Sequence, residues 1–119
     1  MKTIKISKVD KLVSDWVRER AHWRCERCGA QFTPPTSGLH CSHYHGRGKK
    51  SVRFFPDNLT ALCYGCHSYF DGAGREEYRE FKIKQLGKKR FNILNKKAET
   101  LSKESIEIEK ALSWLNSGE

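Results

Sequence analysis

The chain has 119 residues, enough for one compact domain but too few for two domains of ordinary size. Its 23 Lys and Arg residues outnumber the 14 Asp and Glu residues, and the net charge of +9 favours a polyanionic partner such as nucleic acid. The sequence lacks an apolar run of about 20 residues and a secretory signal, which excludes a membrane-spanning protein and predicts a cytoplasmic one with reduced thiols.

The first predicted element is an amphipathic helix over residues 8–23. Apolar residues recur there at helical spacing, with Val9, Val13 and Val17 on one face. Ser7 precedes this run and Asp10 follows three residues later, a pattern typical of a helix N-cap. We therefore expect Ser7 to cap this helix, and the apolar face of the helix to pack on the core.

Two short strands and a helix are predicted in the middle of the chain. On a strand over residues 39–45, the odd-numbered side chains, including His43, share one face, and the even-numbered ones, including Ser42, share the other. Residues 59–62 can return as a second strand after the turn at residues 56–58. A helix should then open at Cys63 and reach about residue 70.

The last third of the chain is predicted to be helical. Residues 75–86 have helical spacing closed by Gly87, and residues 91–94 belong to a further helical piece. Leu101, Ile108, Leu112 and Leu115 follow a seven-residue rhythm, which fits either a helix folded onto the domain or a partner-binding seam. We predict one domain over residues 1–97, with residues 98–119 as a helical extension of it.

Two cysteine pairs have the spacing of metal-binding knuckles. Cys25 and Cys28 form the first pair, and Cys63 and Cys66 form the second. Four thiolates on two tight turns match the tetrahedral coordination of Zn²⁺, so the sequence predicts a structural zinc site. Cys41 is left over, as a buried structural thiol or as an alternative ligand in exchange with one of the four.

A set of polar residues lies between and beside the two cysteine pairs. Hydrolysis of a phosphodiester needs a base, a metal ion that stabilises the developing charge and a group that orients the base. A neutral histidine such as His43 suits the first role, and Asn58 can orient it. His67 on the first turn of a helix can bind the metal ion, with Asp71 at i+4 on the same face.

This arrangement resembles the HNH (ββα-metal) endonuclease family, with nearer similarity to the NinG/Rap recombination endonucleases of lambda-like bacteriophages. The likeness covers about residues 25–94. The residues that carry it are Cys41-Ser-His-Tyr-His-Gly-Arg47, Ser51-Val-Arg-Phe54, Asp57-Asn58, Ala61-Leu-Cys63, Cys66-His67 and Tyr78-x-x-Phe81-x-Ile83-x-Gln85-Leu86-Gly87.

The resemblance implies an α+β fold, with a ββα-metal (HNH) core, a four-cysteine structural zinc site, an N-terminal helix and C-terminal helices. It implies that His43 is the general base, that Asn58 positions it, and that His67 binds a catalytic Mg²⁺ or Mn²⁺ ion with Asp71 or His45. Many HNH enzymes carry Asp or His immediately before the base, whereas this chain has Ser42, and a hydroxyl is a poor ligand for a divalent ion.

The expected partner is DNA. Arg47, Lys49, Lys50 and Arg53 lie in the loop between the predicted base and Asn58, and basic residues from Lys82 to Arg90 could extend this track along the phosphate backbone.

The resemblance implies branched or junction DNA in phage recombination, in the cytoplasm of a phage-infected or prophage-carrying bacterium. The two cuts that resolve a junction favour a homodimer, and the C-terminal helix is a candidate contact for a recombination protein. The alternative interpretation is a non-catalytic zinc-knuckle DNA-binding protein.

Overall fold

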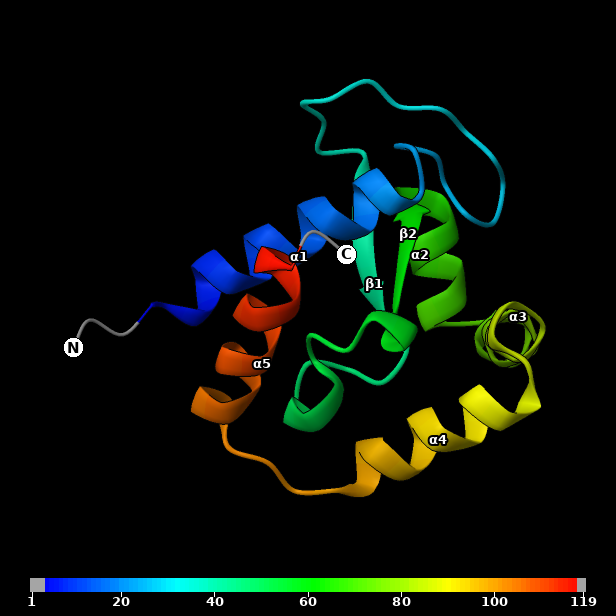
Figure 1. Cartoon of the computed structure of the whole chain (residues 1–119). Coiled ribbons are helices and arrows are strands. Elements are labelled where there is room, and N and C mark those ends of the chain that lie inside the picture. Colours follow the sequence, from blue (N-terminus) through cyan, green and yellow to red (C-terminus); the bar gives the residue numbers. More distant parts are fainter. Residues whose placement is uncertain (1–3, 118–119) are drawn as a thin grey trace.

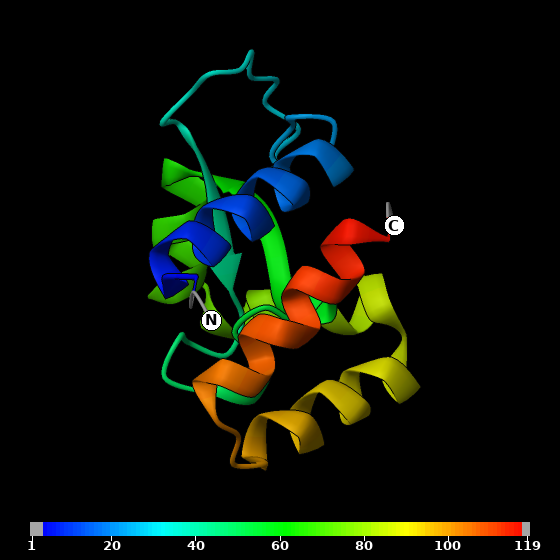
Figure 2. The same cartoon turned by 60° about the vertical axis from the view of Figure 1, so that its left-hand side comes forward.

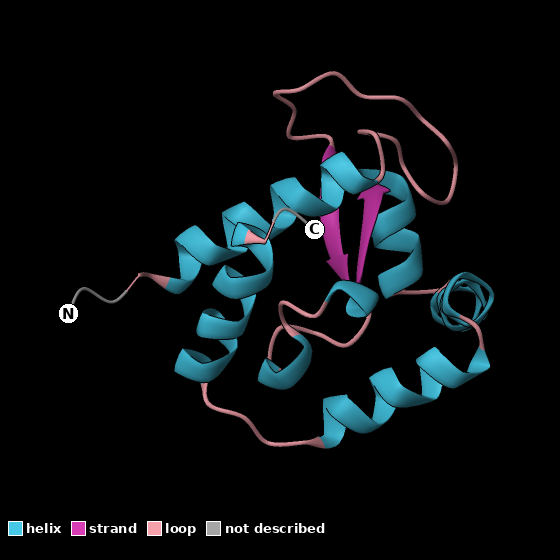
Figure 3. Cartoon of the chain, viewed as in Figure 1, coloured by secondary structure: helices cyan, strands magenta, loops and turns pink. Residues whose placement is uncertain are grey.

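A computed structural model describes residues 4–117 of the chain. Five α-helices surround a sheet of two strands in this part of the chain (Figure 1, Figure 3). The predicted α+β class is therefore confirmed. The elements in chain order are α1 (Ile6–Arg20), β1 (Leu39–His43), the 3₁₀ turns η1 (Lys50–Val52) and η2 (Pro56–Asn58), β2 (Leu59–Cys63), α2 (Tyr64–Asp71), α3 (Arg75–Leu86), α4 (Lys88–Glu99) and α5 (Glu104–Asn116).

Helix α1 starts two residues earlier than predicted, at Ile6, and ends three residues earlier than predicted, at Arg20. The expected N-cap is wrong, because Lys5 occupies the cap position and Asp10 forms an ion pair with Arg53 instead of supporting the helix end. At the other end, His22 and Trp23 adopt left-handed backbone angles, with φ of 56° and 58°. The helix stops there because L-residues cannot continue a right-handed helix in that conformation.

Strands β1 and β2 pair antiparallel, with Leu39 opposite Cys63 and His43 opposite Leu59. The predicted first strand extends to residue 45, but the observed strand ends at His43, because the next two backbone amides bond to Asn58 instead of continuing the ladder. Helix α1 contacts both strands, and so does α2. Figure 2 shows α1 crossing the strands on one side and α2 lying on the other.

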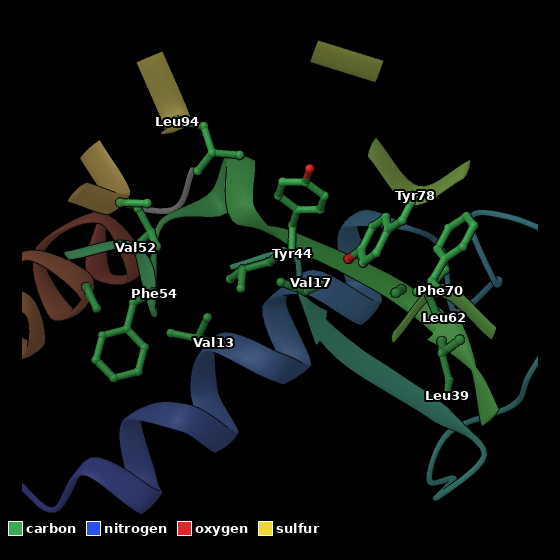
Figure 4. Close-up of a cluster of buried hydrophobic side chains, with 14 of the residues drawn as sticks. Val13, Val17, Leu39, Tyr44, Val52, Phe54, Leu62, Phe70, Tyr78 and Leu94 are labelled. Carbon is green, nitrogen blue, oxygen red and sulfur yellow. The ribbon is translucent and has the colours of Figure 1, made fainter. Parts of the chain in front are cut away.

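The core lies on both sides of this small sheet. On the α1 side, Val9, Val13 and Val17 are buried, as the helical spacing predicts. On the other side the rings of Phe70 and Tyr78 stack with their centroids 4.4 Å apart (Figure 4). Each fully buried apolar side chain contributes about 1.5–3 kcal/mol, so the two layers together hold the hairpin between the helices.

The C-terminal helices close the fold around the loop that joins the two strands. Helix α4 packs on α3 and η1, and α5 packs on α1 and η1. Trp114 of α5 meets Trp16 of α1 edge to face, with ring centroids 4.7 Å apart. Of the two interpretations of the last segment, the structure shows the helix folded onto the domain. The inclusion of Leu101 in its apolar rhythm is wrong, since that side chain is 97% exposed.

None of the helices in residues 4–117 combines the length and the apolar character that crossing a membrane requires.

Candidate functional site

The four paired cysteines converge on one point. Cys25 and Cys28 lie in the turn after α1, and Cys63 and Cys66 lie at the junction of β2 and α2. Their four sulfur atoms all lie within 4.8 Å of one another. Two segments far apart in the sequence therefore meet at a cluster that could hold a metal ion.

The geometry and the donor chemistry of this cluster fit zinc. Tetrahedral coordination with Zn–S bonds of about 2.3 Å separates the sulfurs by about 3.8 Å. Cys28 Sγ and Cys63 Sγ lie 3.8 Å apart. The backbone amides of Cys28 and Cys66 point at Cys25 Sγ and Cys63 Sγ, each at 3.5 Å, which stabilises negative thiolates. The four cysteines could thus hold a zinc ion that fastens the first knuckle to the hairpin.

Neighbouring residues hold the two knuckles in place. Gly29 has a φ of +80° and closes the first turn with a hydrogen bond from its amide to Cys25 O. Glu26 accepts a hydrogen bond from the Ala61 amide on β2 and donates its own amide to Ala61 O. Arg27 donates to Cys66 Sγ at 3.3 Å. The first knuckle is therefore attached to β2 by backbone contacts as well as by the cluster.

Cys41 lies outside the cluster, against α1. Burial raises its pKa to about 11, so its thiol is neutral at physiological pH. The position of Cys41 outside the four-cysteine cluster fits the structural role that the sequence suggested for it.

Asn58 is fully buried beneath the loop that joins the strands. Its Oδ1 accepts a hydrogen bond from the His45 amide at 2.8 Å, and its Nδ2 donates to His45 O and Val52 O at 2.9 and 3.1 Å. All three bonds go to backbone groups. The side chain thus organises the loop that follows His43, and the predicted positioning of His43 can act only through that backbone.

His43 lies at the end of β1 on the α1 side of the sheet. Burial lowers its pKa to about 4, Arg47 and Arg53 add to this effect, and Asp10 opposes it. A hydrogen bond between the His43 ring and the backbone of Arg53 also opposes this effect and raises the pKa. The imidazole is therefore neutral at physiological pH and can accept a proton.

His67 lies on the first turn of α2, on the opposite side of the sheet from His43. Its Nδ1 lies 2.9 Å from Nδ1 of His40 on β1, and its Nε2 lies 3.1 Å from Asp71 Oδ2. His67 and Asp71 therefore lie on the same face of α2, and their joint binding of a metal ion stays a prediction. Burial lowers the pKa of His67 and Asp71 opposes this shift, while Arg47 lowers it further.

His45 and Ser42, the other two positions considered for the catalytic ion, contact residues away from His67. His45 Nε2 lies 2.8 Å from Asn95 Oδ1 on α4, on the far side of the loop from the zinc knuckles. Ser42 is fully buried and its hydroxyl bonds to the Tyr78 hydroxyl at 2.8 Å. In residues 4–117, the hydrogen bonds of both side chains go to residues other than His67.

Some residues of the predicted basic track are exposed, and others are buried in contacts within the protein. Arg47, Lys49 and Lys50 are exposed on the loop after β1. Arg53 is largely buried in its ion pair with Asp10. The expectation for Lys82 is wrong, since this side chain is fully buried, where it donates to Thr60 Oγ1 and Gln85 Oε1.

Sequence reasoning missed two residues that the structure makes prominent. Strand alternation places His40 on the same face of β1 as Ser42. Helix α2, which carries His67, packs on that face, so strand alternation was the available signal for the pairing of His40 with His67. Lys82 lies four residues after the buried Tyr78, on the same face of α3, which was the available signal for its burial. No sequence signal links His45 to Asn95.

The fold and the cluster define an α+β protein with a four-cysteine site that could hold zinc. The family model described as bacteriophage lambda NinG protein matches residues 2–114. Since this match spans nearly the whole chain, the protein belongs to the NinG family. No curated protein and no solved structure matches the chain.

Proposed function

We propose that this protein is a metal-dependent DNA endonuclease of the HNH (ββα-metal) type, acting on branched or junction DNA in phage recombination. One observation carries the proposal. A β-hairpin runs directly into a helix, and the four-cysteine cluster fastens the turn after α1 to their junction, with His43 on the first strand, Asn58 before the second and His67 on the helix. Membership of a phage protein family supports the recombination context.

Arg47 supports a phosphate position at the end of the hairpin. It lowers the pKa of both His43 and His67, so its guanidinium lies within electrostatic range of both rings. Because Arg47 is exposed, a phosphate of the DNA backbone can reach it. The scissile phosphate would then lie at the end of the hairpin, next to the loop that carries Lys49 and Lys50.

His43 would act as the general base. In the free protein its low pKa keeps the ring neutral, so its lone pair is available. A bound phosphate would offset the positive charges of Arg47 and Arg53 and raise the pKa of His43 toward the range that suits proton abstraction from water. A divalent cation at His67 would supply stabilisation of the charge on the phosphorane and the leaving oxygen.

Asn58 would act indirectly, by holding the backbone of the loop that continues from His43. The zinc cluster would act indirectly too, since it fixes the start of α2, and hence His67, relative to the hairpin. A homodimer would fit this function because a junction needs two cuts, and a partner protein could use the outer face of α5.

The second candidate is a zinc-knuckle DNA-binding protein without catalysis. It is favoured by the placement of His43 and His67 on opposite sides of the sheet and by the burial of Ser42, whose hydroxyl bonds to Tyr78. This candidate needs the exposed cations of the loop but not the two histidines.

Cleavage of supercoiled plasmid and of a synthetic four-way junction separates the two candidates. Wild type, His43→Ala and the control His22→Asn are compared at equal zinc content with Mg²⁺, Mn²⁺ or EDTA. His22 is exposed, and Asn tolerates its left-handed backbone. We expect metal-dependent cutting that falls on the order of 10²–10⁴-fold only in His43→Ala. Tight DNA binding by all three proteins without cutting in any metal would refute the nuclease and favour the binding protein.

A further inference from the structure

His40 and His67 come from different elements, β1 and α2, and their rings meet at the edge of the sheet. Their Nδ1 atoms lie 2.9 Å apart, with ring centroids at 5.2 Å and an angle of 77° between the planes. Both residues are half-buried, and Tyr64 beside them is 70% exposed, so the pair is accessible from solvent. His40 has no role in the proposed nuclease mechanism.

The second ring nitrogen of His67, Nε2, determines how the histidine pair is protonated. Its Nε2 lies 3.1 Å from Asp71 Oδ2, which favours a proton on Nε2 because a carboxylate can only accept. In the neutral ring Nδ1 then carries a free lone pair directed at His40. Metal-binding histidines commonly have this arrangement, in which a carboxylate holds the second N–H and leaves the first nitrogen for the ion.

The separation of the two nitrogens also fits a shared ion. Two adjacent ligands of an octahedral ion, each with a metal–nitrogen bond of about 2.05 Å, lie about 2.9 Å apart. The same distance is observed between the two Nδ1 atoms. Without an ion the pair can share one proton at this distance, and binding of an ion would turn each ring so that its lone pair points at the ion.

The other candidate ligands near this place are already engaged. Ser42 lies on the same face of β1, two residues after His40, but its hydroxyl bonds to Tyr78 in the core. His45 is held by Asn95 on α4. His40 is therefore the side chain on β1 that faces His67 with a nitrogen donor.

We propose that His40 and His67 bind one divalent cation through their Nδ1 atoms, with Asp71 orienting His67 from its other nitrogen. Because both protein ligands are imidazoles, the site should select a nitrogen-preferring transition ion such as Ni²⁺ or Co²⁺ over Mg²⁺, whose preferred ligands are oxygens. The use of this ion in DNA cleavage rests on the proposed function, whereas the binding itself does not.

The test is a calorimetric titration of the full-length, zinc-loaded protein with Ni²⁺ and with Mg²⁺. We expect one equivalent of Ni²⁺ in addition to zinc, no displacement of zinc, and far weaker binding of Mg²⁺. Line broadening of the imidazole NMR signals by paramagnetic Ni²⁺ should affect His40 and His67 first. Absence of this one equivalent of Ni²⁺ would overturn the proposal.

Variants identify the ligands. His40→Ala and His67→Ala should lose the bound equivalent of Ni²⁺ while keeping zinc and the far-UV circular dichroism of the wild type. Asp71→Asn should weaken Ni²⁺ binding on the order of 10–100-fold, the usual cost of a changed orienting partner. His45→Ala serves as the matched histidine control and should bind Ni²⁺ as the wild type does. Wild-type Ni²⁺ binding by His40→Ala would overturn the proposal.

The same variants separate this inference from the proposed nuclease. If Ni²⁺ binds at the histidine pair but no metal supports cleavage, the cation site stands and the nuclease fails. If metal-dependent cleavage persists in His40→Ala at the wild-type rate, the nuclease stands and His40 is not a ligand of its ion.

Discussion

Replacement of Asn58 by Ala should destabilise the protein strongly, because the buried amide holds the interstrand loop. The substitution removes three hydrogen bonds and leaves the His45 amide and the His45 carbonyl without their partner, whereas the Val52 carbonyl keeps its bond from the Phe55 amide. An unsatisfied buried polar group costs about 1–3 kcal/mol. Since Asn58 is fully buried, we expect a total loss of about 3–5 kcal/mol in the free energy of unfolding, after some relaxation of the loop.

Urea unfolding of the zinc-loaded protein, followed by far-UV circular dichroism, measures this loss. Asn92→Ala is the matched control, because Asn92 is exposed on α4 and its replacement should change stability by less than about 0.5 kcal/mol. Asn58→Asp keeps an acceptor for the His45 amide but turns an oxygen toward two carbonyls, so it should be at least as destabilising as Ala. A loss below about 1 kcal/mol in Asn58→Ala would refute the role of Asn58 in holding the loop, since one buried and two partly buried hydrogen bonds together contribute more than that.

Four further outcomes follow from the buried groups and the cluster. Burial lowers the pKa of Lys82 from 10.5 to about 8, so its charge penalty is present below about pH 8 and disappears as the pH rises to 10.5. The stability advantage of Lys82→Met in urea unfolding should shrink over that window by about 3 kcal/mol, and a gap independent of pH would contradict this. Trp114→Ala should lose about 2 kcal/mol of unfolding free energy in the same assay, because it removes the contact with Trp16 from a half-buried site. Cys63→Ser should lose zinc, measured by metal analysis, and with it the cooperative thermal transition; retention of both would exclude Cys63 as a ligand. By NMR, the His43 ring should stay neutral through the range in which an ordinary histidine with a pKa near 6.5 protonates, since its own pKa is about 4.

The proposed nuclease places its chemistry on loops and element ends held by distant contacts. The cysteine cluster joins the turn after α1 to the start of α2, and Asn58 ties the loop after β1 to η1 and η2. Disturbing either should reduce cleavage without touching His43. A comparison of stability and cleavage across these variants therefore separates structural from catalytic roles.

Local patterns predicted much of the fold. Helical spacing placed α1 and α3, and the glycine after Leu86 marked the end of α3 as observed. The paired C-x-x-C motifs predicted the four sulfurs that converge, because each pair sits on a tight turn whose geometry is local. Strand alternation correctly separated the side chains of β1 into two faces, since it depends only on the twofold period of an extended backbone.

Only the tertiary structure decided which distant partners these residues meet. Asp10 was expected to cap a helix but pairs with Arg53, and Lys82 was expected on the surface but is buried beside Thr60. Whether a charged or polar side chain faces solvent, a core or a partner depends on how separate elements pack together. The sequence by itself determined the helices, the hairpin and the two cysteine knuckles, because these follow from local spacing, whereas the meeting of the two knuckles depends on how α1 packs on the hairpin. The pairing of His40 with His67 was decided by packing, since it depends on where α2 settles on the sheet.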